Sequence, residues 1–393
     1  MLVINQNKIE SGNKNHLNKF IYFIFGYLFY FMKVKDVTNY LETIAPLALQ
    51  ESYDNSGLLL GSFNSELKGV LISLDITIDI IDEAINNGCN LIIAHHPLIF
   101  SGIKKIIDNN MVSTCLTKAI KNDINLYAIH TNLDNVIGGV NGRIADILGL
   151  KNREVLLPKE NLFKISVFTP TTHKEEVLNS MFRSGAGNIG NYSNCSYSSE
   201  GQGTFKPLDG ANPFRGKKNL LETSSEQKLE VIVPNYYLYK VVDAMKKAHP
   251  YEEVAYDVFP LKNNSNQGSG LVGSLDQPMD ELKFLEKIKL DFGVKALRYT
   301  DFLNKPVEKV AVCGGSGSFL LPNAINKNAD IFITSDYKYH QFFEAEGRIL
   351  IADIGHYESE QYTIDLISDL LIKKFTNFAI RLTKVNTNPI NYL

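Results

Sequence analysis

Three short apolar runs in the first half of the chain predict buried strands. They span residues 70–74, 91–94 and 126–129. Between the first two lies a segment, residues 78–87, whose apolar positions recur at helical spacing. Strands that are apolar throughout and alternate with helices are typical of a mostly parallel sheet that is buried on both faces.

The last third of the chain repeats this scheme. Apolar runs occur at residues 310–313, 331–334 and 349–352, again separated by polar or helical segments. The sequence AINNGCNLIIA, which starts at Ala84, also aligns with AINKNADIFIT, which starts at Ala324. Few positions are identical, but the order of predicted elements matches on both sides. We therefore predict an α/β fold whose mostly parallel sheet domain is internally duplicated.

The pattern changes between about residues 160 and 270. Here the sequence predicts two strand and helix units: strands at 163–168, 229–233 and 254–261, and helices at 173–184 and 237–248. Units of this size and order indicate a small ferredoxin-like α+β domain inserted into the larger one. Segments rich in Pro, Asn and Gly flank it on both sides.

An apolar stretch near the N-terminus, FIYFIFGYLFYFM at residues 20–32, resembles a signal peptide. It is shorter than the roughly 20 residues that cross a bilayer, and no small-residue cleavage site follows it. We expect Met32 to be the natural start and residues 1–31 to be a non-native or disordered extension. The alternative is a membrane-surface anchor, which the lack of a separate polar face disfavours.

Composition narrows the class of protein. The 393 residues carry 40 basic and 43 acidic side chains, for a net charge of −3, and this balance disfavours a dedicated nucleic-acid binder. The four cysteines are far apart and form no C-x-x-C pair. This spacing argues against a disulfide scaffold or a zinc ribbon and fits a reducing cytosol, so we expect a cytoplasmic protein. Because the apolar stretch is too short to span a bilayer, we expect no membrane partner.

Ionisable residues gather directly after the predicted strands. They include five of the eight histidines and several carboxylates: His95, His96, His130, His340, His356, Asp75, Asp134, Asp336, Asp353 and Glu360. In open α/β sheets ligands bind at the carboxyl ends of the strands, so these side chains are the candidates for chemistry. The glycine-rich segment 314–318 matches neither a P-loop nor a dinucleotide fingerprint.

Two motifs indicate metal ligation. In AHHP, adjacent His95 and His96 on an extended chain point to opposite sides, which suits two metals or one metal and one hydrogen-bond partner. In GHYESE, His356 and Glu360 share one face if the segment opens a helix. Either motif by itself also fits ordinary polar surface residues.

Together these groups favour two metals. Three histidines and two carboxylates are too many for one open tetrahedral site but suit a pair of divalent ions that activates water for hydrolysis. Such donors admit Zn, Fe, Mn, Co or Ni.

Six segments, in order, resemble signatures of the Nif-three-like dinuclear metal-centre family, whose bacterial members are often named GTP cyclohydrolase I type-two homologues. They are ESYDNSGLLLG, SLDIT, NLIIAHHPLIF, AIHTNLDN, ITSDYKYH and DIGHYESE. The resemblance covers residues 33 to about 375. In the first segment Tyr53 stands where the family usually has Trp.

The resemblance implies metal ligands and an assembly. It places two metal ions per chain on His95, His96, Asp134, His356 and Glu360, with His130, His340 and Asp336 at nearby positions in the cleft. Residues 185–198 and 249–261 are similar to the PII- and CutA-like insert of longer bacterial members. It also implies a toroidal homohexamer.

We expect a metal-dependent hydrolase that acts on a nucleotide-like or other small substrate, with His130 or His340 relaying protons and Asp336 beside them. The alternative is a non-catalytic metal or small-molecule sensor, and a ring that threads nucleic acid is disfavoured by the net charge. The expected domains are residues 32–158 and 269–376 for the duplicated halves, 159–268 for the insert and 377–393 for a tail.

Overall fold

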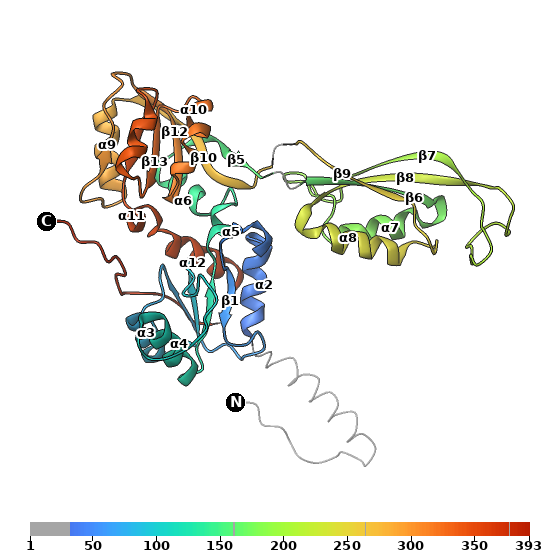
Figure 1. Ribbon diagram of the computed structural model, residues 1–393, viewed down its shortest axis with the longest axis horizontal. Helices are drawn as coiled ribbons and strands as arrows, with labels where there is room; N and C mark the ends of the chain where they lie inside the picture. The colour runs from blue at the N-terminus through green and yellow to red at the C-terminus, as the bar shows by residue number, and fades with distance from the viewer. Residues whose placement is uncertain (1–31, 160–161, 264, 377) are drawn as a thin grey trace, which may run out of the picture. The chain divides into compact units, whose positions relative to one another are not determined.

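The computed structural model describes residues 32–159, 162–263, 265–376 and 378–393 (Figure 1). The extension predicted for residues 1–31 lies outside the described residues. The chain separates into two compact units. The first contains described residues 32–43, 55–129 and 367–387, and the second contains the remainder.

The first unit is built on a five-stranded sheet of order β1-β4-β3-β2-β15. Strands β4, β3, β2 and β15 run parallel, and only β1 at the edge is antiparallel to its neighbour. The predicted runs correspond to β2, β3 and β4. The strands are β1 (Gly57–Leu60), β2 (Val70–Ser73), β3 (Leu91–Ala94), β4 (Asn125–Ala128) and β15 (Ile380–Leu382).

Helices α3 (Ile78–Asn86) and α4 (Met111–Lys121) pack on this sheet. Their buried residues, such as Ile81 and Leu116, form one apolar cluster with strand residues such as Ile92. The side chains of Thr77 and Asn110 cap the two helices by accepting hydrogen bonds from backbone N–H groups. Further helices are α2 (Val34–Ile44) and α12 (Thr363–Lys374).

The predicted C-terminal tail contains a strand that the sequence pattern does not predict. In β15, Ile380 pairs with Val70 of β2 and extends the sheet by one parallel strand. Thr387 then donates a hydrogen bond to Asp75, at 2.5 Å. The segment therefore belongs to the first sheet.

The second unit contains a six-stranded sheet of order β11-β14-β13-β12-β10-β5. Strands β12, β13 and β14 are parallel, and the other pairs are antiparallel. The apolar runs of the last third correspond to these three parallel strands. The strands are β5 (Lys151–Pro158), β10 (Gly268–Met279), β11 (Arg298–Tyr299), β12 (Val307–Ser316), β13 (Ile331–Ser335) and β14 (Leu350–Asp353).

The helices of this part of the second unit precede, connect or follow these strands and carry several candidate residues. They are η1 (Leu47–Leu49), α5 (Thr131–Asp134), α6 (Val140–Leu148), α9 (Glu281–Asp291), η3 (Ser318–Leu320), α10 (Leu321–Asn326), η4 (Tyr339–Ala345) and α11 (His356–Glu360). The mixed α/β class predicted from the apolar runs is confirmed: the first sheet is mostly parallel, and the second has three parallel strands, β12, β13 and β14.

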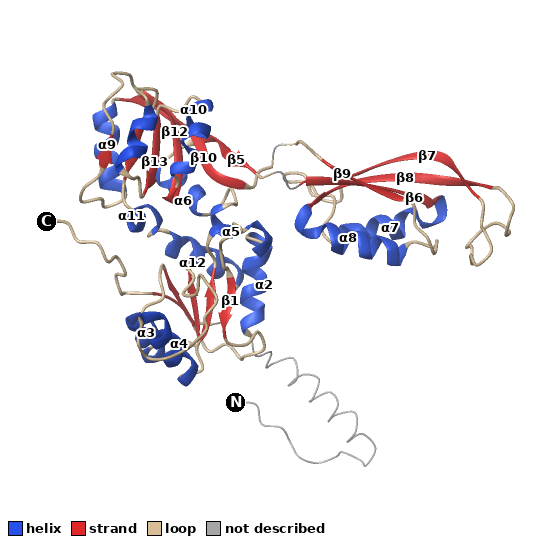
Figure 2. Ribbon diagram, in the orientation of Figure 1, coloured by secondary structure: helices blue, strands red, loops and turns tan. Residues whose placement is uncertain are grey.

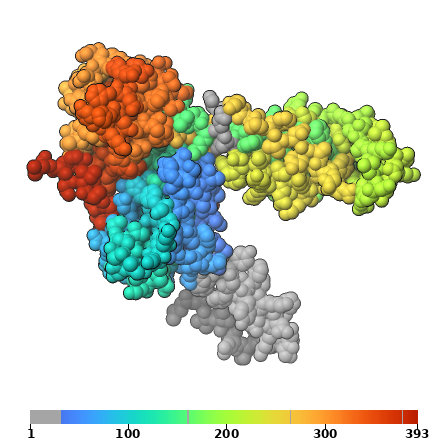
Figure 3. Space-filling view, viewed as in Figure 1, coloured from blue at the N-terminus to red at the C-terminus, as the bar shows by residue number. Residues whose placement is uncertain are grey.

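The second unit also contains a four-stranded antiparallel sheet of order β7-β8-β6-β9. Helices α7 and α8 cover one of its faces (Figure 2). The chain order β6-α7-β7-β8-α8-β9 with this strand order is that of a ferredoxin-like fold. Residues 206–221 connect β7 and β8 and lie on the yellow-green surface of Figure 3. The elements are β6 (Leu162–Pro170), η2 (Thr171–His173), α7 (Lys174–Arg183), β7 (Ser196–Phe205), β8 (Glu222–Pro234), α8 (Asn235–Ala248) and β9 (Tyr256–Pro260).

Among the described residues, we find no helix with the length and apolar character needed to cross a membrane.

Candidate functional site

In the first unit, His95 and His96 follow β3 at the carboxyl edge of the sheet. The backbone N–H of His96 donates to the Leu74 carbonyl, at 2.9 Å, so the parallel ladder continues into the dipeptide. The two rings lie 5.0 Å apart between centroids and are tilted by 46°. A ligand atom of one lies within 4.8 Å of a ligand atom of the other.

Each of these two imidazoles is held through Nδ1. His95 is fully buried, and its Nδ1 lies 2.8 Å from the Ile129 carbonyl oxygen. Because a carbonyl only accepts, Nδ1 of His95 carries the proton and its Nε2 has the lone pair. His96 places Nδ1 2.7 Å from an oxygen of Asp75, the residue that follows β2.

In the second unit, the imidazole of His130 is also held by an acceptor at Nδ1. Its Nδ1 lies 2.7 Å from Oδ1 of Asp54, whose side chain is fully buried. The other oxygen of Asp54 accepts the backbone N–H of Thr131, at 3.0 Å, and also the Thr131 hydroxyl. Asp54 therefore fixes both the ring of His130 and the start of α5.

Residues in and next to the ESYDNSG motif also hold the segment that contains α5. The side-chain amide of Asn135 donates to the Leu49 carbonyl, at 2.9 Å, and to Glu51, at 2.8 Å. Glu51 in turn pairs with Lys159, at 2.8 Å. Residues 49–54 thus form a rigid support for α5, which ends at Asp134.

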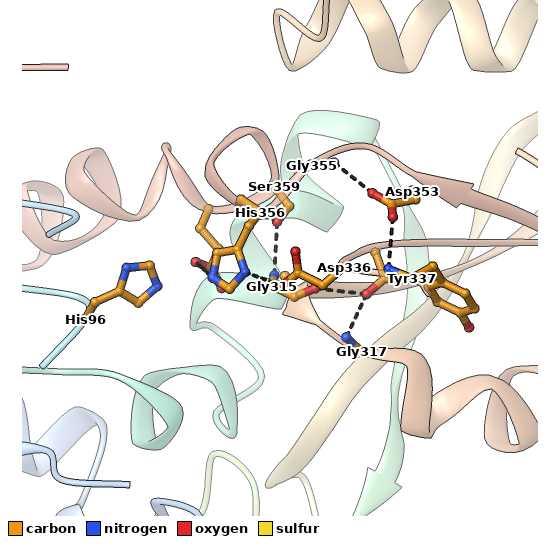
Figure 4. A network of polar contacts seen from close by, with 12 residues as sticks. His96, Gly315, Gly317, Asp336, Tyr337, Asp353, Gly355, His356 and Ser359 are labelled. Carbon is orange, nitrogen blue, oxygen red and sulfur yellow. Dashed lines mark hydrogen bonds and ion pairs between the residues drawn. The ribbon is translucent and has the colours of Figure 1, made fainter. Parts of the chain in front are cut away.

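His356 and Glu360 begin and end α11, as the GHYESE spacing predicts. Nε2 of His356 lies 3.1 Å from Oε2 of Glu360. Nδ1 of His356 lies 2.6 Å from Oδ2 of Asp336 (Figure 4). Glu360 is 3% exposed, whereas Asp336 is open to solvent. Asp336 has a φ of +60°, the left-handed region that non-glycine residues rarely adopt.

Asp353 connects the two loops that carry Asp336 and His356. One oxygen of Asp353 accepts the backbone N–H of Tyr337, at 3.0 Å, and the other accepts that of Gly355, at 3.2 Å (Figure 4). Arg298 pairs with the same carboxylate. Asp353 therefore stabilises the loops rather than presenting a ligand.

A glycine makes room for Glu360. Gly315 follows the apolar part of β12 with a φ of +62°, and a Cβ there would lie 2.4 Å from Oε1 of Glu360. The Gly315 N–H donates to the Ser359 hydroxyl, at 3.0 Å, which ties β12 to α11. The glycine-rich segment 314–318 thus accommodates a carboxylate and the helix that bears it.

Nearby carboxylates raise the pKa values of two groups in the second unit, Cys313 and His356. Burial raises the pKa of the Cys313 thiol, and the negative charges of Asp134 and Glu360 raise it further. Burial lowers the pKa of His356, but the hydrogen bonds and charges of Asp336 and Glu360 outweigh it and raise that pKa to about 11. Negative charge therefore gathers around Cys313 and His356, which favours a cation there.

His340 differs from the other candidates. It lies exposed in η4, and its ring packs against Tyr339 with centroids 5.2 Å apart. Among the described residues it makes no hydrogen bond to another candidate residue. The structure thus brings together His130 with Asp54, and His356 with Asp336 and Glu360, but not His340.

Sequence reasoning did not identify Asp54 as a functional residue, and it gave Asp75 no role. Each accepts a hydrogen bond from the Nδ1 of a histidine that is distant in sequence, at His130 and His96. The only available signal was the aspartate in ESYDNSG and in SLDIT. Neither motif by itself reveals which imidazole the aspartate contacts.

The fold and the site define a mixed α/β protein with histidines held in place near the ends of its strands. Comparisons with known proteins identify its family. The model of the family Duf34/NIF3 (NGG1p interacting factor 3) matches residues 32–389. A relative from Halalkalibacterium halodurans, named GTP cyclohydrolase 1 type 2 homolog, is 41% identical over 365 residues, which cover 91% of this chain and 98% of the relative. A relative of the same name from Bacillus subtilis is 39% identical, with 91% and 98% covered.

Solved structures agree with this assignment. A Bacillus cereus protein related to NIF3 superposes with a TM-score of 0.78 at 39% identity, covering 92% of this chain and 100% of that one. A Staphylococcus aureus protein gives a TM-score of 0.74 at 30% identity, with 92% and 99% covered. The chain belongs to the Duf34/NIF3 family.

Proposed function

We propose that this protein binds two divalent metal ions and hydrolyses a nucleotide-like or other small substrate. The proposed metal ligands are His95, His96, Asp134, His356 and Glu360. When bound, two such ions lower the pKa of water and stabilise negative charge that develops on the substrate. The name of the curated relatives, GTP cyclohydrolase 1 type 2 homolog, suggests a nucleotide but is a name given by homology.

One observation carries the proposal. The three imidazoles among the proposed ligands each have Nδ1 held by an acceptor: a backbone carbonyl for His95, and an aspartate for His96 and His356. Metal-binding histidines almost always donate their second ring N–H in this way, because it fixes the tautomer and makes the other nitrogen more basic. The donor set of imidazoles and carboxylates fits Zn, Fe, Mn, Co or Ni.

Protein groups would then move protons. His130 is our first candidate, because Asp54 orients its ring and stabilises the imidazolium that forms when Nε2 accepts a proton. His340 is the second candidate. For Asp336 we propose a positioning role, since it contacts Nδ1 of His356.

Metal content of the purified protein tests the site. We expect about two metal ions per chain and a marked loss in His95→Ala and in Glu360→Ala. His340→Ala is the control, and it should keep the full content. Unchanged metal in both ligand variants would overturn the site assignment.

Activity tests the reaction. A metal-loaded sample should hydrolyse at least one member of a panel of nucleotides, phosphoesters and amides. His96→Ala should abolish this activity, and His130→Ala should reduce it while metal is retained. A metal-loaded protein that hydrolyses none of the panel would instead support the second function, a metal or small-molecule sensor.

We also propose the domain boundaries given above for the two halves and for the insert, with residues 159–268 as a PII- and CutA-like domain. The ferredoxin-like element order supports it. The two parallel sheets support the internal duplication, since their central strands follow the same order, β4-β3-β2 and β14-β13-β12.

A homohexameric toroid is the proposed assembly. Exposed aromatic side chains, among them Tyr299, Tyr339 and Phe343, line a groove of about 880 Å³ in the second unit and support self-association. Sedimentation equilibrium should give six times the chain mass, and a monomer would overturn this proposal.

A further inference from the structure

The ferredoxin-like region contains a cavity of about 330 Å³. All its lining residues fall between Gly203 and Ala255, outside the two parallel sheets. They come from the end of β7, the segment between β7 and β8, strand β8 itself and the segment that follows α8. Its volume lies in the range of about 300–1,000 Å³ that is usual for small-molecule sites.

Three aromatic rings form the apolar walls of this cavity. Tyr251 lies between the other two, with ring centroids 6.0 Å from Phe205 and 6.1 Å from Phe214. The rings are tilted by 54° and 47° to that of Tyr251, so their faces do not stack on one another. The face of an aromatic ring attracts positive charge through its quadrupole.

A buried carboxylate, Glu226, adds the polar contact. Glu226 is 9% exposed, and its Oε1 accepts a hydrogen bond from the Tyr251 hydroxyl, at 2.9 Å. The absence of a side chain at Gly203 gives it space, because a Cβ there would lie 2.2 Å from Oε2 of Glu226. In the part of the chain that the structure describes, no Lys, Arg or His forms an ion pair with this carboxylate. A buried negative charge without a cation is costly unless a ligand supplies one.

The other charges of the lining lie at its exposed rim. Lys206 and Arg215 are open to solvent, and Nη1 of Arg215 lies 3.4 Å from the Ser224 hydroxyl. Burial raises the pKa of Tyr251, and the positive charge of Arg215 partly offsets this rise. Glu252 and Glu253 are also exposed and balance these two cations. Water screens exposed charges, so the buried carboxylate determines which charge the interior prefers.

We propose that this cavity is a binding site for a small organic cation. The ammonium group contacts the carboxylate of Glu226, and the apolar body of the ligand lies against Phe205, Phe214 and Tyr251. The site goes beyond the proposed metal chemistry and does not depend on it.

Choline and its neutral isostere, neopentyl carbinol, test the proposal by calorimetric or NMR titration of the full chain. The two have the same shape and differ in charge. We expect choline to bind saturably and the isostere to bind at least about tenfold more weakly. Glu226→Gln should weaken choline binding by about tenfold and leave the isostere unchanged, and Phe214→Leu should weaken choline binding severalfold, since both remove an attraction to positive charge.

Glu253→Gln is the matched control, because it removes an exposed carboxylate from the same lining. It should change choline binding less than twofold, and thermal unfolding should show that each variant is folded. Equal binding of choline and the isostere overturns the proposal, as does an equal loss in Glu226→Gln and Glu253→Gln. Absence of saturable binding by tetramethylammonium, choline and spermidine alike also overturns it. His356→Ala, in which the proposed metal site is damaged, should bind choline normally, so the two proposals fail separately.

Discussion

The two parallel sheets share a scaffold but differ in the side chains at their carboxyl ends. Each has three central parallel strands in the same order, and each carries one antiparallel strand, β1 or β11, beside the last of the three. The match extends to single hydrogen bonds. Asn90 before β3 accepts the backbone N–H of Lys68, and Asp330 before β13 accepts that of Glu308, each through its side chain.

The chemistry diverges where the second strand ends. In the first sheet β3 is followed by His95 and His96, both proposed ligands. In the second sheet the aligned residues are Ser335 and Asp336, and Asp336 holds an imidazole that arrives from α11. The same strand order thus places proposed ligands at the edge of the first sheet and a carboxylate that supports a ligand at the edge of the second. The strands determine where residues lie, and the residues that follow them determine the chemistry.

The largest expected effect is that of Gly315→Ala in the second sheet. A Cβ there would lie 2.4 Å from Oε1 of Glu360, in addition to the cost of a φ of +62°. We expect a loss of about 2–4 kcal/mol in the free energy of unfolding, with loss of metal, measured by urea unfolding and elemental analysis. Gly88→Ala in the first unit is the control: its φ is +67° and it has open space, so it should cost about 1 kcal/mol. Equal costs would show that the contact with Glu360 is unimportant.

Metal affinity tests whether the supporting aspartates are equivalent. Asp336→Asn and Asp75→Asn each replace the acceptor at a histidine Nδ1 by a weaker, uncharged one. We expect each to lower metal affinity by about 10- to 100-fold, measured by competition with a chelator. An unchanged affinity in one variant would confine the supporting role to the other sheet.

The charge on His356 predicts a pH dependence in the metal-free protein. Its pKa is raised from the ordinary 6.5 to about 11, so the imidazolium stabilises the folded state. This contribution is complete below pH 6.5 and is lost as the pH rises towards 11. Between about pH 6 and pH 10 the wild type should therefore lose more stability in urea unfolding than His356→Gln does. Parallel curves for the two proteins would contradict the prediction.

The smallest expected effect is on the acid dependence of stability. Asp330 is ionisable, whereas Asn90 at the matching position of the first sheet is not. Burial raises the pKa of Asp330, but hydrogen bonds from the backbone N–H of Lys309 and from the Lys305 side chain outweigh it and lower that pKa. The resulting stability is present above the ordinary pKa of 3.8 and is lost as the pH falls through the lowered value. Asp330→Asn should cost about 1 kcal/mol at neutral pH and show a shallower acid dependence in unfolding measurements. An unchanged acid limb would exclude this contribution.

Much of the fold was predictable because it depends on local patterns. Apolar runs located β2, β3, β4, β13 and β14 to within one residue at each end, since a strand that is buried on both faces must be apolar throughout. The run at residues 310–313 marked only the middle of β12, which extends three residues further at each end. The i and i+4 spacing of His356 and Glu360 likewise predicted their contact in α11. Strand β15 was missed because its short run carries Arg381 and gains its place only by pairing with β2.

The sequence by itself determined the α/β class, the strands and the residue types at their ends, because periodicity and chain order act over short distances. Tertiary structure alone decided which carboxylate holds which imidazole: Asp54 lies 76 positions from His130, and Asp336 lies 20 positions from His356. It also decided that Gly315 accommodates Glu360 and that the insert encloses a cavity beside Glu226. A hydrogen bond depends on distance and direction in space, and no local pattern records which distant segment will supply its partner.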